Sequence, residues 1–159
     1  MARFYNADRG QFTITPWQQI DANVAIPDAN PAGVENSVQI DNDVTIEAVQ
    51  VRVTADHTST RDVAIELISP SGTRSVLMTP RTGTIGGLNG FNNMQMLSHH
   101  FYGESAQGQW TIRLIDTQGE DEAFVFDPRS GAEDIRAVHR NNEQDGTLTS
   151  WQIRFIGHN

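Results

Sequence analysis

The chain of 159 residues contains no cysteine and no lysine, and its apolar residues occur only in short runs. Without cysteine, disulfides and thiolate metal sites are excluded. All 11 basic residues are arginines, and they face 20 acidic residues, which gives a net charge of −9. Clustered lysine and arginine supply most of the affinity for nucleic acid, so we expect no nucleic-acid partner. No run approaches about 18 apolar residues, so we expect no membrane span.

The first residues lack the apolar region that a signal peptide contains, so we expect no signal peptide in this chain. This leaves two expectations open, namely an intracellular protein or a piece of a longer secreted precursor. The length predicts one domain, at about 150 residues per domain. Such a chain can bury about two-thirds of its unfolded surface without disulfides or metals.

Alternating apolar and polar residues recur in short stretches, at 12–15, 49–54, 63–68, 75–78, 110–115 and 151–155. A period of two places one set of side chains on a core and the other set toward water. Most of these stretches are separated by Gly, Pro, Asn or Asp, which favour turns. The sequence therefore predicts an all-β fold, an antiparallel β-sandwich or jelly roll of about eight strands.

The three tryptophans have different sequence environments. Trp110 and Trp151 alternate with polar neighbours, so both are predicted to be core anchors. Trp17 follows Pro16 outside a clear strand, and we expect it to pack over the end of the sandwich. The alternative is an exposed ring that contacts a partner.

The composition suggests two regions and one unusual segment. Residues 1–25 are predicted to be a lead-in with a possible first strand, and residues 26–159 the jelly roll. The segment 120–145 contains eight acidic residues and three arginines. Loops longer than about 15 residues are usually functional or disordered, so we expect a feature specific to this protein here. Within it, only 132–140 has the spacing of a short helix, with Ile135 and Val138 on one side.

A tight turn follows the strand predicted at 63–68. Pro70 presets its own φ angle, and Gly72 can adopt a positive φ. The segment Ser69-Pro70-Ser71-Gly72 is therefore predicted to form a type II turn. In such a turn, serine hydroxyls can cap main-chain groups.

The segment 57–73 carries a motif of six residues, which are His57, Asp62, Ser69, Pro70, Gly72 and Thr73. They are in register with a family pattern of His, a few polar residues, Gly-Asp-Leu, alternating apolar residues and Ser-Pro-x-Gly-Thr. The segment therefore resembles the P domain, also called the Homo B domain, of kexin- and furin-type proprotein convertases and related bacterial subtilisin-like proteases. Arg61 stands where the family usually has Gly, and Val63 where it has Leu, so the Arg-Gly-Asp tripeptide of many members is absent.

The resemblance continues through four further motifs in the family's order, and it spans residues 26–156. Ile26-Pro27-Asp28 with Gly33 resembles the first strand of the family. The central block and the strand after it are matched by Phe91-Asn92, His100, Gly103-Glu104, Gly108, Trp110 and Asp116. The closing hairpin is matched by Gly146-Thr147-Leu148-Thr149-Ser150-Trp151.

The resemblance implies a non-catalytic module, C-terminal to a subtilisin-type catalytic domain. In the family this module packs on the protease, supports its folding and stability, and modulates its dependence on calcium and pH. The implied partner is a subtilisin-like serine protease domain, in cis or in trans. The implied location is secreted, extracellular or periplasmic, as part of a longer precursor.

Calcium is the one cofactor that the residues themselves suggest. Five carboxylates fall in predicted loops or at strand ends, and clusters of hard oxygen ligands there suit Ca²⁺. The alternative is that these carboxylates accept main-chain N–H groups and fix turns. The five candidates are Asp28, Asp56, Asp62, Glu104 and Asp116.

No catalytic residue is predicted. The segment 103–108 superficially resembles the G-x-S-x-G nucleophile elbow, but it has one residue too many before the second Gly. The five histidines lack metal-ligand spacing. We expect His57 and His100 to donate buried hydrogen bonds to loop carbonyls.

The sequence leaves two other functions open. The first is a stand-alone jelly roll that binds carbohydrate or another surface ligand, because function belongs to a site rather than to a fold. Such a site needs exposed aromatic rings, for which the candidates are Trp17, Phe101, Tyr102, Phe124 and Phe126. The second is a structural subunit of a larger assembly.

Overall fold

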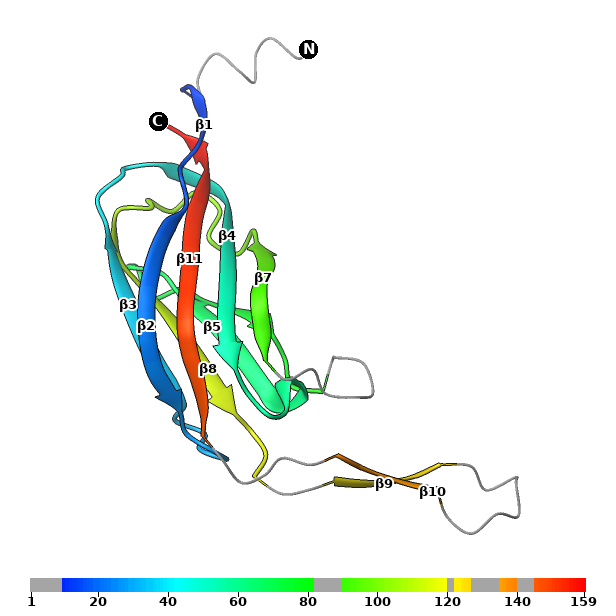
Figure 1. The fold of residues 1–159 in the computed structure, drawn as a ribbon. Coiled ribbons are helices and arrows are strands. Elements are labelled where there is room, and N and C mark those ends of the chain that lie inside the picture. The colour runs from blue at the N-terminus through cyan, green and yellow to red at the C-terminus, as the bar shows by residue number, and fades with distance from the viewer. Residues whose placement is uncertain (1–9, 82–89, 120–121, 127–134, 140–144) are drawn as a thin grey trace.

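The computed structural model describes residues 10–81, 90–119, 122–126, 135–139 and 145–159, and two antiparallel sheets face each other in it (Figure 1). In the first sheet, β11 (Gly146–His158) lies between β4 (Thr45–Asp56) on one side and β1 (Phe12–Ile14) and β2 (Gln18–Ile26) on the other. The far edge of this five-stranded sheet is β7 (Phe91–Ser98), which pairs with β4.

The second sheet has four strands, in the order β3 (Val34–Ile40), β8 (Gly108–Asp116), β5 (Val63–Ile68) and β6 (Arg74–Met78). The described residues contain no α-helix, only the 3₁₀ turn η1 (Thr60–Asp62). They therefore include no helix of the length and apolarity that crossing a membrane requires. The predicted all-β antiparallel sandwich is confirmed, with nine strands in the two facing sheets.

The core lies between the sheets and is built around two aromatic anchors. Trp110 and Trp151 are fully buried, as predicted, and their indole N–H groups donate to Ala106 O at 2.7 Å and Asn36 Oδ1 at 2.8 Å. Two more buried rings contact Trp110, with centroid distances of 5.0 Å to Phe101 and 5.1 Å to Phe155. Each indole N–H therefore has an acceptor, so both tryptophans are buried without an unsatisfied donor.

The predicted lead-in is part of the five-stranded sheet. β1 and β2 both pair with β11, in registers that include Phe12↔His158 and Ile20↔Trp151. The predicted boundary between residues 25 and 26 therefore falls inside β2. The alternation of Ile20, Ala22 and Val24, which pack against the core, is the sequence signal for this strand.

The helix predicted at 132–140 is wrong in its described part, because residues 135–139 form the strand β10 (Ile135–His139). β10 pairs with β9 (Glu122–Phe126) as a separate two-stranded sheet, in a register from Ile135↔Phe126 to His139↔Glu122. Two β-branched residues in a five-residue segment fit a strand once a partner strand is available to pair with. That partner cannot be identified from the segment itself.

The turn after β5 is also different from the prediction. Gly72 N–H donates to Ser69 O at 2.9 Å, so Gly72 is the fourth residue of the turn, and its φ is +87°. A type II turn needs a positive φ at the third residue, and Ser71 does not have one. The hairpin is instead a type I turn followed by a left-handed residue, and Gly72 provides that residue.

Candidate functional site

At one end of the sandwich, the predicted motif residues meet around a buried histidine. His57 Nε2 donates to Asp116 Oδ2 at 3.2 Å, and both side chains are fully buried. His57 Nδ1 accepts the main-chain N–H of Ser59 at 3.0 Å, which places the ring proton on Nε2. Asp116 Oδ1 accepts the N–H of Gln118 at 3.2 Å. The pair thus ties the start of the segment 57–73 to the end of β8.

A serine and a second aspartate adjoin this pair, but they do not form a catalytic triad. Ser59 Oγ donates its proton to Asp62 Oδ2 at 2.5 Å, and the group of Ser59 that bonds the His57 ring is the main-chain N–H. Both side chains are buried, so substrate could not reach the hydroxyl. A triad requires a hydrogen bond from nucleophile to base at an accessible position. The hydrogen bonds of this cluster therefore stabilise the fold and are not arranged for nucleophilic catalysis.

Gly146 lies directly against the imidazole ring of His57. A Cβ atom at residue 146 would be 2.4 Å from His57 Cδ2 and 2.8 Å from Asp56 O. Those distances are too short for any side chain, so the first residue of β11 has to be a glycine while the histidine is in place. The motif at 57–73 and the motif at 146–151 are thereby in contact.

At the opposite end of β5, the turn residues gather around a second carboxylate. Ser71 Oγ donates to Glu104 Oε2 at 2.7 Å, and the Ser71 hydroxyl also lies 2.9 Å from Ser69 Oγ and 3.2 Å from Thr73 Oγ1. Thr73 N–H donates to Ser69 Oγ at 3.2 Å. Nearby, Gly108 packs on Pro70 so closely that a Cβ atom at residue 108 would be 2.6 Å from Pro70 Cβ.

Burial favours the neutral form of Glu104, but other interactions outweigh it. Hydrogen bonds from Thr73, Ser69 and Ser71 and the charge of His100 leave the pKa of the Glu104 carboxyl below its ordinary value of 4.5. The ionised form is therefore favoured by the folded state. The carboxylate contributes stability at pH values above its unfolded pKa, and this contribution is lost as the pH falls through the lowered folded pKa.

Replacing Glu104 with glutamine should consequently reduce stability at neutral pH and have little effect in acid. The expected difference at pH 7 is about 1 kcal/mol, because partial exposure weakens hydrogen bonds to a charged group. Urea unfolding of both proteins from pH 7 to pH 3 measures it. A difference that stays constant over this range would contradict the assignment.

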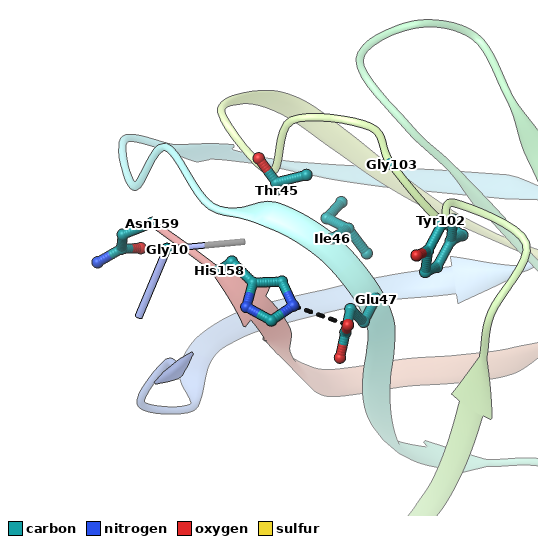
Figure 2. A pocket seen from close by; sticks show the side chains of 8 residues that line it. All are labelled: Gly10, Thr45, Ile46, Glu47, Tyr102, Gly103, His158 and Asn159. Atoms are coloured by element: carbon teal, nitrogen blue, oxygen red, sulfur yellow. Dashed lines mark hydrogen bonds and ion pairs between the residues drawn. The ribbon is translucent and has the colours of Figure 1, made fainter. Parts of the chain in front are cut away.

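A pocket lies where the two ends of the described chain meet the start of β4, and Figure 2 shows its lining. Its volume is about 360 Å³, and His158 Nε2 donates to Glu47 Oε1 at 2.7 Å across it. The lining comes from four segments of the chain. It consists of Gly10, Thr45, Ile46, Glu47, Tyr102, Gly103, His158 and Asn159.

Main-chain hydrogen bonds hold these four segments together. Ile46 N–H donates to Glu104 O at 2.8 Å, and Gly103 N–H donates to Ile46 O at 2.7 Å, which fixes the loop carrying Tyr102. Asn159 N–H donates to Gln11 O at 3.2 Å, and a Cβ atom at residue 10 would collide with Asn159 O. The pocket is thus built by the sheet and does not depend on a ligand for its shape.

Exposed apolar side chains surround this pocket. Tyr102 is 62% exposed, Phe12 is 56% exposed and Ile14 is 50% exposed. The Phe12 ring meets the His158 ring edge-on at 6.0 Å, and Ile14 lines an adjoining pocket of about 260 Å³ that shares Asn159 with the first. We refer to the first pocket together with Phe12, Ile14 and Tyr102 as the terminal surface. A group of exposed apolar residues around a hollow is typical of a protein contact surface.

Comparison with known proteins identifies the family. The family model of the proprotein convertase P-domain matches residues 46–155. The chain belongs to the proprotein convertase P-domain family. The "Aeromonas extracellular serine protease" of Aeromonas sobria is 37% identical over 157 residues, which cover 90% of this chain and 25% of that protein. Human "proprotein convertase subtilisin/kexin type 6" is 32% identical over 114 residues, 72% of this chain and 10% of that protein.

Solved structures agree with this assignment. The crystal structure of the Aeromonas sobria serine protease in complex with a chaperone superposes with a TM-score of 0.82 and 34% identity, over 99% of this chain and 29% of that one. The resemblance of the motifs to the P domain is therefore confirmed. The P domain is a non-catalytic accessory domain of such proteases. The chain spans about a quarter of the length of its Aeromonas relative.

The five carboxylates proposed for calcium are not brought together in this P domain. Asp62 and Asp116 belong to the buried histidine cluster, Asp56 ends β4, and Glu104 belongs to the serine cluster. In the part of the chain that the structure describes, no three His, Cys, Asp or Glu side chains are grouped so that they could hold a metal ion. Calcium binding stays a prediction. Asp28 lies at the β2 end, where its N–H donates to Asp145 Oδ1 at 3.0 Å.

Two expectations about histidines and aromatic rings need correction. His57 is buried, but it donates to a carboxylate and not to a loop carbonyl, and His100 is exposed. Phe101 is fully buried, so it offers no ring to a sugar. Trp17 is half-buried against Arg52 and Arg154, two side chains on the outside of the five-stranded sheet. The side chains of Phe124 and Phe126 lie outside the described residues.

Proposed function

We propose that this P domain stabilises and positions the catalytic domain of a subtilisin-like serine protease, in cis or in trans. The terminal surface is the contact that we assign to this role. The observation that carries the proposal is the exposure of Phe12, Ile14 and Tyr102 around a preformed pocket, in a family whose relatives are longer proteases. By analogy with the extracellular Aeromonas protease, we propose that the protein acts outside the cytoplasm.

The position of the terminal surface suits such a contact. Both ends of the described chain lie at the same end of the sandwich (Figure 1), and Gly10 and Asn159 themselves line the pocket. A catalytic domain joined through either end would therefore lie next to this surface. The buried residues of the His57 cluster lie at the other end of β11 and β4, where they join β4, β8 and β11.

The experiment compares the yield, half-life and melting temperature of the cognate catalytic domain with and without this P domain. Removal of the domain is expected to lower all three. Tyr102→Ser and Phe12→Ser should weaken the contact about tenfold each, since each removes an exposed aromatic ring from the interface. An unchanged yield and half-life after deletion of the whole domain would contradict the proposal.

The matched control is Leu97→Ser. Leu97 is 52% exposed, like the contact residues, but it lies on the edge strand β7 and does not line the terminal pockets. We expect Leu97→Ser to leave the protease unaffected. If it reduced the half-life as much as Tyr102→Ser does, the contact would not be at the terminal surface.

A further inference from the structure

Two arginines and a tryptophan form a cluster on the outer face of the five-stranded sheet. The guanidinium carbons of Arg52 and Arg154 lie 4.2 Å and 4.4 Å from the centroid of the Trp17 ring. Both arginines alternate with buried core residues along β4 and β11, so their side chains point away from the core. We call this cluster, with the glutamines that contact it, the Trp17 face. Those glutamines are Gln50, Gln95 and Gln152, and Gln152 in turn donates to Gln19.

The glutamines orient both guanidinium groups. Arg52 Nε donates to Gln95 Oε1 at 3.0 Å, and Arg154 Nε donates to Gln50 Oε1 at 2.6 Å. Arg52 Nη1 makes a longer contact of 3.5 Å with Gln152 Oε1. Because each Nε is engaged, both Nη atoms of Arg154 and Nη2 of Arg52 are left for other acceptors. A guanidinium held in this way is preorganised for bidentate binding of a carboxylate.

On the four-stranded sheet, by contrast, the arginines form ion pairs with glutamates. There Arg74 Nη1 lies 3.2 Å from Glu66 Oε1, and Arg113 Nη1 lies 3.6 Å from Glu66 Oε2. Arg113 also lies 3.9 Å from Glu35 Oε1. On that face, each of these arginines has a carboxylate partner.

The arginines of the Trp17 face have no such partner among the described residues. The side-chain hydrogen bonds of Arg52 and Arg154 all go to glutamine oxygens. The chain has 20 acidic residues and a net charge of −9, so carboxylates are abundant and yet not paired here. Two like charges over one ring repel each other, and an anion between them would relieve that repulsion.

We propose that the Trp17 face binds an extended, carboxylate-bearing segment of a protein partner. In the strand register, Gln152 pairs with Arg52 and Arg154 pairs with Gln50, so the two arginines are diagonal neighbours. Such neighbours are about 7 Å apart. Carboxylates at alternate positions of an extended chain are also about 7 Å apart, which matches one carboxylate to each guanidinium. The Trp17 ring and the surrounding amides contribute further contacts to such a segment.

This inference goes beyond the proposed contact with a protease domain and does not depend on it. The terminal surface presents exposed rings such as Phe12 and Tyr102, whereas the Trp17 face presents two arginines and several amides. Substitutions at one surface should leave binding at the other unchanged. The two proposals can therefore fail independently, and each failure would be seen in its own binding measurement.

The probe is a short capped peptide of alternating threonine and glutamate, compared with the same peptide in which glutamine replaces glutamate. Isothermal calorimetry measures the affinity, and the indole N–H signal of Trp17 in two-dimensional NMR locates the binding. We expect the glutamate peptide to bind and to shift the Trp17 signal, and the glutamine peptide to bind about tenfold more weakly or not at all. The net charge of −9 disfavours non-specific association with an acidic peptide.

Arg154→Gln and Arg52→Gln should each weaken binding of the glutamate peptide by about tenfold or more, because each removes one charged fork. The matched control is Arg74→Gln, which changes the net charge equally but lies on the other sheet, and it should bind as the unchanged protein does. Equal weakening by Arg74→Gln, equal binding of both peptides, or no binding of the glutamate peptide would overturn the proposal. Binding of an oligogalacturonide in place of the peptide would also overturn it, in favour of an acidic-glycan surface.

Discussion

Replacing His57 with alanine is expected to lower the free energy of unfolding by about 3–5 kcal/mol, because it removes a hydrogen bond to the buried Asp116 carboxylate and leaves a cavity in place of the ring. The substitution removes the hydrogen bond to Asp116 Oδ2 and the acceptor for Ser59 N–H, and it opens a cavity beside Gly146. For a chain of this size, the melting temperature should fall by about 10 °C. Thermal and urea unfolding measure both quantities.

The control for this prediction is His99→Ala. His99 is exposed, and its ring makes one contact, between Nδ1 and Glu47 O at 3.1 Å. Exposed substitutions of this kind usually change stability by less than about 1 kcal/mol. If His57→Ala and His99→Ala had similar effects, the buried pair would not be the structural tie that we describe.

Replacing Trp110 with alanine should also lower stability by about 3–5 kcal/mol, through the loss of buried area and the cavity that remains. Trp110 is fully buried and contacts the rings of Phe101 and Phe155. Trp110→Phe should lower stability less, since a ring remains and the main loss is the hydrogen bond to Ala106 O. Urea unfolding of the two variants separates packing from hydrogen bonding.

Trp17→Ala is the matched control for the tryptophan series. The Trp17 ring is half-buried and stacks with Arg52 and Arg154 on the outside of the sheet. We expect its removal to lower the free energy of unfolding by about 1 kcal/mol. The predicted order of destabilisation is therefore Trp110→Ala, then Trp110→Phe, then Trp17→Ala. A loss at Trp17 as large as that at Trp110 would mean that the Trp17 ring belongs to the core.

The family motifs are explained by contacts between distant parts of the chain. His57 contacts Asp116 and Gly146, while Pro70 contacts Gly108. The residues of these pairs are far apart in sequence, and they meet at the ends of strands where β4 pairs with β11 and β5 pairs with β8. The motifs thus identify the residues that close the sandwich, which is consistent with a module that has a supporting role.

Strands with strict alternation were predictable, and those with weaker patterns were missed. β4, β8 and β11 alternate Val, Ile, Leu or Trp with polar residues, and each is buried on one side. β7 has the segment Phe91–Ser98, where methionines and asparagines blur the pattern, and it is a strand because β4 pairs with it. β10 is a similar case, since pairing with β9 overrides the helical spacing of Ile135 and Val138.

The sequence by itself determined the fold class, the two buried indoles and the family, because alternation, turn residues and motif order are local or sequential properties. Only the tertiary structure decided which polar side chains meet. It placed Asp62 and Asp116 around His57 and Glu104 among the turn serines, and it brought Arg52 and Arg154 against the Trp17 ring. Which side chains meet depends on the register of the strands and on which strands are neighbours, and neither is encoded in the residue spacing of one segment.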